Sequence, residues 1–339
     1  MIGQQNFDSG SVSGDPLISL DFPAGSPAVS SDGKLFVPSQ GGVRVFRQYM
    51  DGDGPAAAFT FTVDNSVPAG VSIHEQKLVV VEDNLVAIFD AVPDEPPGAP
   101  AATAGGGAPC TASALNGPRA AYLTPAGQLV VADTGNHRVL IWDPIPAGGG
   151  ALGNARVVLG QQRKDTCVAN DRDGNRASDA PSAETLNGPT SVWTNGEKLI
   201  VVDRRNHRVL IWDNLPTEDA QAANHVIGQS DFDKALTNAG GPAPTASTLF
   251  DPISVDVSET GEMAVVDRQN NRVLIWNSIP TSSTQPADRV VGHADFVTGT
   301  PGPPSATSMN NPSGVRFDGQ NMIVVDGSNN RVLVFRALD

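Results

Sequence analysis

Short apolar runs, separated by turns that contain Gly, Pro or Asn, occur along the whole chain. Four segments repeat one order of apolar and polar positions most closely, namely VVADTGNHRVLIW, IVVDRRNHRVLIW, AVVDRQNNRVLIW and IVVDGSNNRVLVF. Each segment indicates two strands of about five residues joined by a tight polar turn. The chain is therefore predicted to consist of repeated antiparallel strands.

Two weaker copies, KLFVPSQGGVRVF and KLVVVEDNLVAIF, precede these four. In every copy a first strand follows a recurring proline and comes before the two central strands. In the first copy this proline is taken to be Pro27, which is followed by Ala28. A fourth strand follows them, as in residues 156–160, 225–228 and 289–292. Six units of four short antiparallel strands are typical of an all-β, six-bladed β-propeller.

The last copy lacks a fourth strand, but the first residues of the chain resemble one. Met1-Ile-Gly-Gln-Gln-Asn-Phe7 matches Val226-Ile-Gly-Gln-Ser-Asp-Phe232. We expect this N-terminal strand to complete the last blade and to close the ring, which removes an open sheet edge. A single domain over residues 1–339 is expected, with residues 1–7 as the closing strand and blades over residues 15–63, 66–114, 115–161, 186–230, 249–294 and 309–339.

The pattern VxD-x-x-N-H/N-R-V-x-V/I-W/F in these segments resembles the NHL repeat. The resemblance covers nearly the whole chain, although the Asn-x-Arg element is partly lost in the first two copies. It implies a six-bladed ring with a central channel. It implies little about function, because NHL propellers include sensors, protein- or RNA-binding platforms and enzymes.

Charge and hydropathy restrict the partners of this chain. The formal net charge is −15, which repels a phosphate backbone and argues against nucleic acid. No apolar stretch approaches the ~18 residues of a membrane span, so we expect no membrane insertion. A monomer that binds a small anionic ligand or a protein partner is the expected form.

The sequence contains two cysteines, Cys110 and Cys167. They lie in successive loops between blades, where a disulfide would join the two loops. One disulfide fits an exported protein, whereas two free thiols are compatible with the cytosol. We expect a secreted or periplasmic protein whose leader lies outside this sequence.

Residues that recur in every strong copy are interpreted as scaffold. The strand-ending aspartates and the arginines five residues later would pair across the tight turn and satisfy backbone groups. They are Asp133, Asp203, Asp267 and Asp326 with Arg138, Arg208, Arg272 and Arg331. His137 and His207 suggest metal ligands, but Asn271 and Asn330 stand in the same place, so these positions are also assigned to the scaffold.

Positions that differ between blades are the candidate functional positions. Arg204 and Arg268 follow the repeated aspartate directly, and Arg119 follows a recurring proline at the start of an innermost strand. Three arginines at one channel mouth would bind a carboxylate or a phosphate. The alternative is that each arginine pairs with a neighbouring acidic residue. Further predicted ligand-binding residues at this mouth are Thr190, Ser313, Arg205 and Gln269.

The same positions argue against one known catalytic site. Some NHL propellers are amidating lyases that hold zinc through histidines, one of them directly after the proline of the first strand. Here that place holds Arg119, Thr190, Ile253 and Ser313, so a three-histidine zinc site is not expected and no catalytic residue is assigned. Arg204 and Arg268 match the position of a functional arginine in those lyases.

One long connection between blades resembles a calcium-binding loop. Asp171, Asp173, Asn175 and Asp179 offer alternating oxygen ligands. The glycine is displaced from its EF-hand position and the closing glutamate is missing, so a solvated acidic loop is the alternative. No other cofactor is expected.

These features favour a propeller that acts as a ligand- or protein-binding scaffold through its loop-rich face and channel mouth. The alternative is a hydrolase or lyase that acts on an anionic small molecule at the same mouth.

Overall fold

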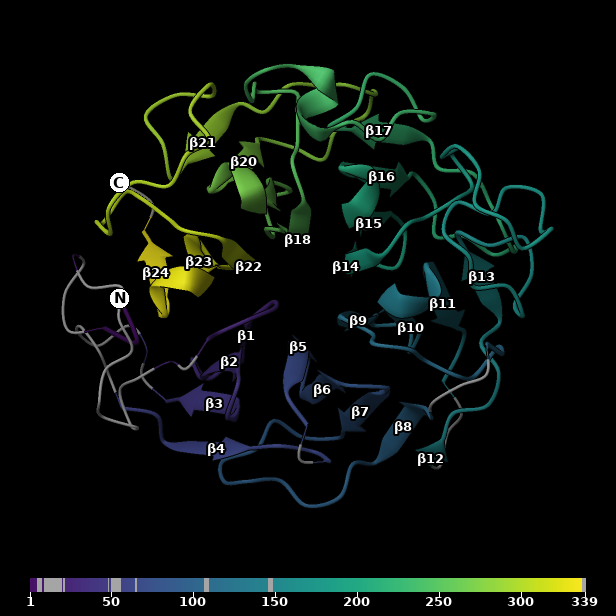
Figure 1. The fold of residues 1–339 in the computed structure, drawn as a ribbon. Coiled ribbons are helices and arrows are strands. Elements are labelled where there is room, and N and C mark those ends of the chain that lie inside the picture. The colour runs from purple at the N-terminus through teal and green to yellow at the C-terminus, as the bar shows by residue number, and fades with distance from the viewer. Residues whose placement is uncertain are drawn as a thin grey trace.

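The structure is a computed structural model that describes residues 1–4, 8, 20, 22–47, 49, 56–64, 66–106, 110–145 and 149–336. Its strands form six sheets arranged in a ring around one axis, with the first strand of each sheet facing the centre (Figure 1). The protein is an all-β, six-bladed propeller, as predicted. The helices of the described residues are short 3₁₀ turns, and none of them is long and apolar enough to span a membrane.

The blades follow one another along the chain. Blade 1 contains β1 (Ala28–Val29), β2 (Leu35–Ser39), β3 (Gly42–Phe46) and β4 (Phe59–Phe61). Blade 2 contains β5 (Pro68–His74), β6 (Lys77–Glu82), β7 (Leu85–Phe89) and β8 (Ala102–Gly105). Blade 3 contains β9 (Ala120–Leu123), β10 (Leu129–Asp133), β11 (Arg138–Trp142) and β13 (Val157–Leu159).

The second half of the ring is the more regular. Blade 4 contains β14 (Pro189–Thr194), β15 (Leu199–Asp203), β16 (Arg208–Trp212) and β17 (His225–Ile227). Blade 5 contains β18 (Pro252–Val257), β19 (Met263–Asp267), β20 (Arg272–Trp276) and β21 (Arg289–Val291). Blade 6 contains β22 (Pro312–Asp318), β23 (Asn321–Asp326) and β24 (Arg331–Phe335).

Two blades depart from the regular four strands. Blade 2 gains a fifth strand, β12 (Gly150–Ala151), which comes from the connection after β11 and pairs with β8 in parallel. Blade 6 has three named strands, and its outer edge is occupied by the N-terminus. Ile2 forms an isolated antiparallel bridge with Val332, in which each backbone N–H donates to the other residue's carbonyl at 2.9 Å.

The register of this bridge matches that of the outer strands in other blades. Ile2 faces Val332 as Ile227 faces Val209. The Gln4 side chain donates to the Asn330 carbonyl, and Gln229 donates in the same way to the His207 carbonyl. Residues 1–4 therefore take the place of an outer strand. The strand expected over residues 1–7 stays a prediction, because residues 5–7 lie outside the described part of the chain.

Apolar residues on both faces of the central strands explain how the blades pack. Every residue of β10, β11, β15, β16, β19 and β20 is buried, since each sheet lies between two neighbours. Six hydrophobic clusters result, one at each interface between adjacent blades. The cluster between blades 6 and 1 contains Ile2, Leu20, Phe46 and Val325, so the ring also closes through its core.

A repeated hydrogen bond links neighbouring blades at the tight turns. After each 3₁₀ turn of blades 3–6, one residue adopts left-handed backbone angles, and its side chain accepts a bond from a backbone N–H of the next blade. We call these bonds the inter-blade latches. The acceptor–donor pairs are His137–Gly188, His207–Asp251, Asn271–Asn311 and Asn330–Phe22. In blade 2, Asn84 accepts from Gly117 in the same manner.

Candidate functional site

The central channel is lined by the innermost strands, so the order of residues along a strand becomes depth in the channel. Thr190, at the start of β14, lines one mouth, a cavity of about 90 Å³. Ser191 and Val192 line a constriction of about 30 Å³. Trp193 lines the opposite mouth, a wider cavity of about 610 Å³. Strands β5, β18 and β22 follow the same order from mouth to mouth.

The smaller mouth brings together the three arginines that the sequence singles out. Nε and Nη2 of Arg204 donate to the two carboxylate oxygens of Asp251 at 2.6 and 3.0 Å. Nη1 of Arg268 lies 3.5 Å from the same carboxylate. The Arg119 side chain is exposed to the channel, and no described residue pairs with it. Arg204 and Arg268 thus share one carboxylate, and the alternative that each arginine pairs with an acidic residue holds for these two but not for Arg119.

The electrostatics of the mouth reflect this excess of positive charge. Desolvation inside the ring lowers the pKa of Arg119, and the positive charges of Arg204 and Arg268 lower it further. The pKa of Arg268 is lowered by burial and by Arg204, and is partly restored by Asp251. Both arginines still carry their charge at neutral pH, because a guanidinium does not lose its proton in proteins. The mouth is consequently a cationic site in an acidic protein.

The predicted hydroxyl residues of the mouth are present, but their hydroxyls serve the scaffold. Thr190 and Ser313 line the cavity and are nearly fully buried. The Thr190 hydroxyl donates to the Ile253 carbonyl at 3.0 Å, and the Ser313 hydroxyl donates to the Pro23 carbonyl at 3.3 Å. Each bond crosses to the next blade, so these side chains fix the shape of the mouth.

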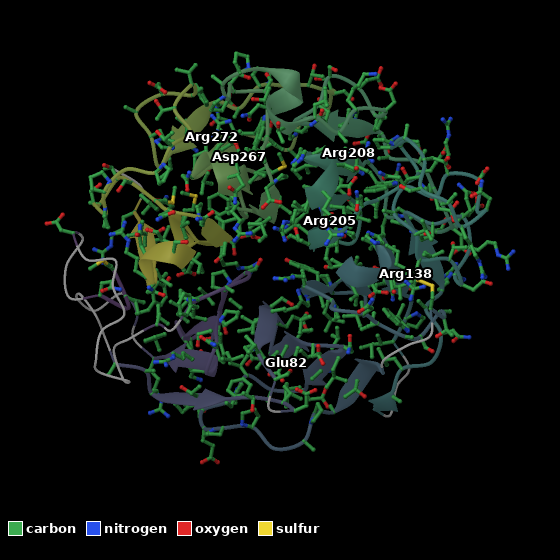
Figure 2. All side chains as sticks on the ribbon, in the orientation of Figure 1. Glu82, Arg138, Arg205, Arg208, Asp267 and Arg272 are labelled. Carbon is green, nitrogen blue, oxygen red and sulfur yellow. A yellow bond between two sulfur atoms is a disulfide. The ribbon has the colours of Figure 1, made fainter. Side chains whose placement is uncertain are left out.

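Arg205 and Gln269 lie outside this cavity. The Arg205 side chain packs over Gly188, and its charge contributes to the lowered pKa of His137 (Figure 2 labels Arg205). Gln269 donates to the Asn311 side chain at 3.2 Å. Both residues are exposed. The structure thus separates them from Arg119 and Arg268, which line the cavity itself.

Blade 1 uses a different proline from the one expected. Ala28, predicted to follow the recurring proline, is buried in the core between blades 1 and 2. The mouth is instead lined by Ala24, Gly25 and Ser26. Phe22, directly before Pro23, has the positive φ that Gly117, Gly188, Asp251 and Asn311 have before their prolines. Residues Pro23-Ala24-Gly25 therefore correspond to Pro68-Ala69-Gly70, and the prediction was four residues too late.

Asp251, the shared carboxylate, was not identified from the sequence. A signal was available, because the residue before the recurring proline is Gly117, Gly188 or Asn311 in the neighbouring blades. Left-handed backbone angles favour Gly and Asn at that place. An aspartate there needs another reason, and its two arginine partners provide it.

The repeated Asp–Arg pairs are fully buried scaffold. In all four pairs the arginine Nε lies 2.7 or 2.8 Å from the aspartate Oδ2, and both side chains have no exposed surface. Asp267 and Arg272, labelled in Figure 2, are one example. Nη2 of each arginine also donates to two carbonyls in the loop that enters its blade, as Arg208 does to Ser182 and Thr185. These bonds hold the end of each long loop to the ring.

His137 and His207 are latch residues. Each ring accepts a backbone N–H at Nδ1, so it is neutral in this arrangement. Burial is the main cause that lowers the pKa of both rings. Asn271 and Asn330 do the same work in blades 5 and 6, which agrees with the assignment of this position to the scaffold.

The loop between blades 3 and 4 takes part in two further predicted features. Cys110 and Cys167 form a disulfide that joins two successive loops, with Cα atoms 6.2 Å apart. Asp171, Asp173 and Asp179 lie together, with one carboxylate oxygen of each within 4.8 Å of the others. Asn175 lies beside this group, since its Nδ2 donates to Asp173 at 2.8 Å and its Oδ1 accepts the Ala177 N–H.

The opposite mouth of the channel was not identified from the sequence. Its wall includes Tyr122, Trp193 and Phe317, and its floor is closed by Arg316 and Asp256. Nη1 of Arg316 donates to Asp256 at 3.2 Å, and the charge of Asp256 is the main cause that raises the pKa of Arg316. These residues come late in the innermost strands, where the blades share no recurring pattern.

Comparisons with known proteins agree with this architecture. The family model described as "NHL repeat" matches residues 115–142. A search of the curated proteins found no relative of this sequence. Among solved structures, the WD40 β-propeller domain of Doa1 is similar with a TM-score of 0.51 and 9% identity, covering 93% of this chain and 79% of that one. The computationally designed Ika8 protein has a TM-score of 0.45 and 9% identity, with coverages of 90% and 80%. The repeat matched over residues 115–142, together with the six-bladed ring, supports an NHL-repeat β-propeller.

Proposed function

We propose that this propeller is a binding scaffold whose smaller channel mouth holds an anionic group of its ligand. The observation that carries the proposal is the Arg119 guanidinium, which lies beside Arg204 and Arg268 and has no acidic partner among the described residues. Carboxylates and phosphates form strong, often bidentate hydrogen bonds with arginine. The ligand would neutralise the charge that Asp251 leaves uncompensated.

The size of the mouth restricts what enters it. A cavity of about 90 Å³ accommodates one carboxylate or phosphate group but not a whole metabolite. The remainder of the ligand would therefore lie above the ring, against the long loops that the buried arginines hold in place. This arrangement suits a small carboxylate or phosphate compound, or an acidic group on the surface of a protein partner.

Binding is better supported than catalysis at this site. A hydrolase or lyase needs a nucleophile or a base within reach of the substrate. Here the Thr190 and Ser313 hydroxyls donate to backbone carbonyls, and Asp251 is held by two arginines. The mouth offers positive charge and hydrogen-bond donors, which are what anion binding requires.

Calorimetric titration with a set of mono- and dicarboxylates and phosphate esters tests the proposal. We expect at least one of these anions to bind, and Arg119→Gln to weaken its binding by at least about tenfold. Arg205→Gln is the matched control, because it removes an exposed arginine of the same face that lies outside the mouth. Equal binding by the wild type and Arg119→Gln would refute the proposal, as would failure of every anion to bind at millimolar concentration.

We also propose that the protein works outside the cytoplasm as a monomeric ring. The Cys110–Cys167 disulfide supports an oxidising compartment. Alkylation of protein taken directly from its source, followed by mass spectrometry, should find both cysteines protected. Light scattering on the purified protein should give the mass of one chain, 35.2 kDa.

A further inference from the structure

Asp171 differs from every other buried aspartate that the structure describes. Asp133, Asp203, Asp256, Asp267 and Asp326 are buried, and each is paired with an arginine. Asp171 has no exposed surface, yet no described cation pairs with it. Its Oδ2 accepts the Arg176 backbone N–H at 3.1 Å, whereas its Oδ1 is buried without a hydrogen-bond partner.

Such a carboxylate is costly to bury. A buried charge needs a counter-charge, and a buried acceptor without a donor costs about 1–3 kcal/mol or more. The buried Glu82 shows the other solution, since it has no arginine but accepts bonds from two backbone N–H groups and from Ser66. Asp171 has one such bond. A cation next to Oδ1 would neutralise this buried carboxylate.

The equivalent loop of blade 5 shows that the scaffold does not need this carboxylate. Asn170 and Asn206 exchange side-chain hydrogen bonds, and Asn238 and Asn270 do the same one blade later. Ala239 follows Asn238 where Asp171 follows Asn170. The stretch from Asn170 to the next buried leucine is five residues longer than its counterpart, and these extra residues fall in the acidic segment. The insertion therefore brings the carboxylates with it.

Two more carboxylates complete a set of oxygen ligands around the buried one. The oxygens of Asp173 and Asp179 lie within 4.8 Å of that of Asp171. Asp179 Oδ2 accepts the Arg172 backbone N–H at 3.1 Å, and both oxygens of Asp173 accept bonds from Asn175. The nearby Arg176 guanidinium does not neutralise the cluster, because it lies 3.3 Å from Asp165 instead. The loop thus holds the carboxylates close together without a cation of its own.

We propose that Asp171, Asp173 and Asp179 bind one Ca²⁺ ion in this loop. The ligands are all hard oxygens, the preference of Ca²⁺ and Mg²⁺, and they come from an irregular loop. Calcium accepts six to eight oxygens in variable geometry, whereas magnesium demands a regular octahedron and retains its water. Backbone carbonyls and water would supply the other ligands. The ion would neutralise Asp171 and fix the insertion to the ring, close to the loop end anchored by Cys167.

The experiment is calorimetric titration of Ca²⁺ into chelator-treated protein. Thermal unfolding is measured in parallel with Ca²⁺ or Mg²⁺ at about 1 mM, a concentration at which extracellular calcium sites are occupied. We expect one Ca²⁺ per chain, a higher Tm with Ca²⁺, and binding of Mg²⁺ that is at least about tenfold weaker. Asp179→Asn, at an exposed ligand, and Asp171→Asn, at the buried one, should each weaken Ca²⁺ binding by at least about tenfold.

The control variant is Asp233→Asn, which removes one exposed carboxylate from the corresponding loop of blade 5 and should leave Ca²⁺ binding unchanged. Three results would overturn the proposal. They are no Ca²⁺ binding by the wild type, Ca²⁺ binding that survives both ligand substitutions, and a loss in Asp233→Asn as large as that in Asp179→Asn. Equal affinity for Mg²⁺ would overturn the assignment to calcium. Asp179→Asn keeps the test valid if Asp171→Asn does not fold.

Discussion

At the scale of single residues, repetition within the chain distinguishes scaffold from site. A residue that the scaffold needs recurs at the same place in successive blades, as the buried aspartates and their arginines do in blades 3–6. A departure from the repeat needs a local cause. Asp251 replaces the Gly or Asn of other blades and binds two arginines, and Asp171 replaces an alanine and lies in an acidic cluster.

Asp251→Asn tests whether this carboxylate limits anion binding. Asparagine adopts the required left-handed angles, as Asn311 does in blade 6 (φ 48°), so the backbone should be retained. Removal of the competing negative charge should strengthen binding of the ligand anion about three- to tenfold. The measurement is the same calorimetric titration. Weaker binding would show instead that Asp251 chiefly orients Arg204 and Arg268.

At the scale of the element, the tight turn after the second strand in blades 3–6 also joins each of these blades to the next. Its latch residue is histidine in blades 3 and 4 and asparagine in blades 5 and 6. A neutral imidazole accepts the bond at Nδ1, but an imidazolium has only donors. Two of the latches are therefore sensitive to acid and two are not.

The pH dependence of stability should report this difference. Burial lowers the folded-state pKa of His137 and His207, so the unfolded chain binds these protons more tightly. Their contribution is complete above the unfolded pKa of about 6.5 and is lost as the pH falls below it. The double variant His137→Asn/His207→Asn should match the wild type at pH 7.5 and lose less stability at pH 5.

Urea unfolding at the two pH values measures this effect. The double variant gives the acid sensitivity of all other groups, and the difference between the wild type and the double variant gives the contribution of the two rings. The same loss between pH 7.5 and pH 5 in both proteins would contradict the role assigned to the histidines. A variant much less stable at pH 7.5 would show that asparagine does not replace histidine in these two blades.

The strands and the candidate site differ in how far the sequence predicts them. Blades 3–6 are predictable because one pattern recurs four times, and it also places Arg119 and Arg268 at the same mouth. Blade 1 was placed incorrectly at its proline, since Pro23 and Pro27 both lie before an apolar pair and only the backbone angles of Phe22 distinguish them. Two features of the sites depend on contacts between residues far apart in the sequence, which no local pattern encodes. Asp251 pairs with two arginines, and the buried Asp171 has no described cation beside it.

At the scale of the whole molecule, the ring is held by six similar interfaces, and the last of them joins the two ends of the chain. Ile2 is fully buried there, between blades 6 and 1. A terminal residue usually frays. The position of Ile2 opposite Val332 predicts that it contributes as much as a residue inside the chain.

Ile2→Ala and Ile227→Ala make a matched pair, because both residues pair with the third strand of a blade at the same register. Each truncation removes a buried side chain and should cost about 2–4 kcal/mol of unfolding free energy. Denaturant unfolding of the two variants gives the comparison. A cost below about 0.5 kcal/mol for Ile2→Ala, with the full cost for Ile227→Ala, would show that the N-terminus does not close the ring.

The constriction in the channel has a kinetic consequence. About 30 Å³ is near the volume of a single water molecule in the liquid, and the ion pair of the half-buried Arg316 with the buried Asp256 closes the constriction from the wider side. An anion bound at the smaller mouth, as proposed, would therefore leave by the mouth through which it entered. Its residence time would depend on the loops above that mouth, and a molecule on the far face would change neither its arrival nor its escape.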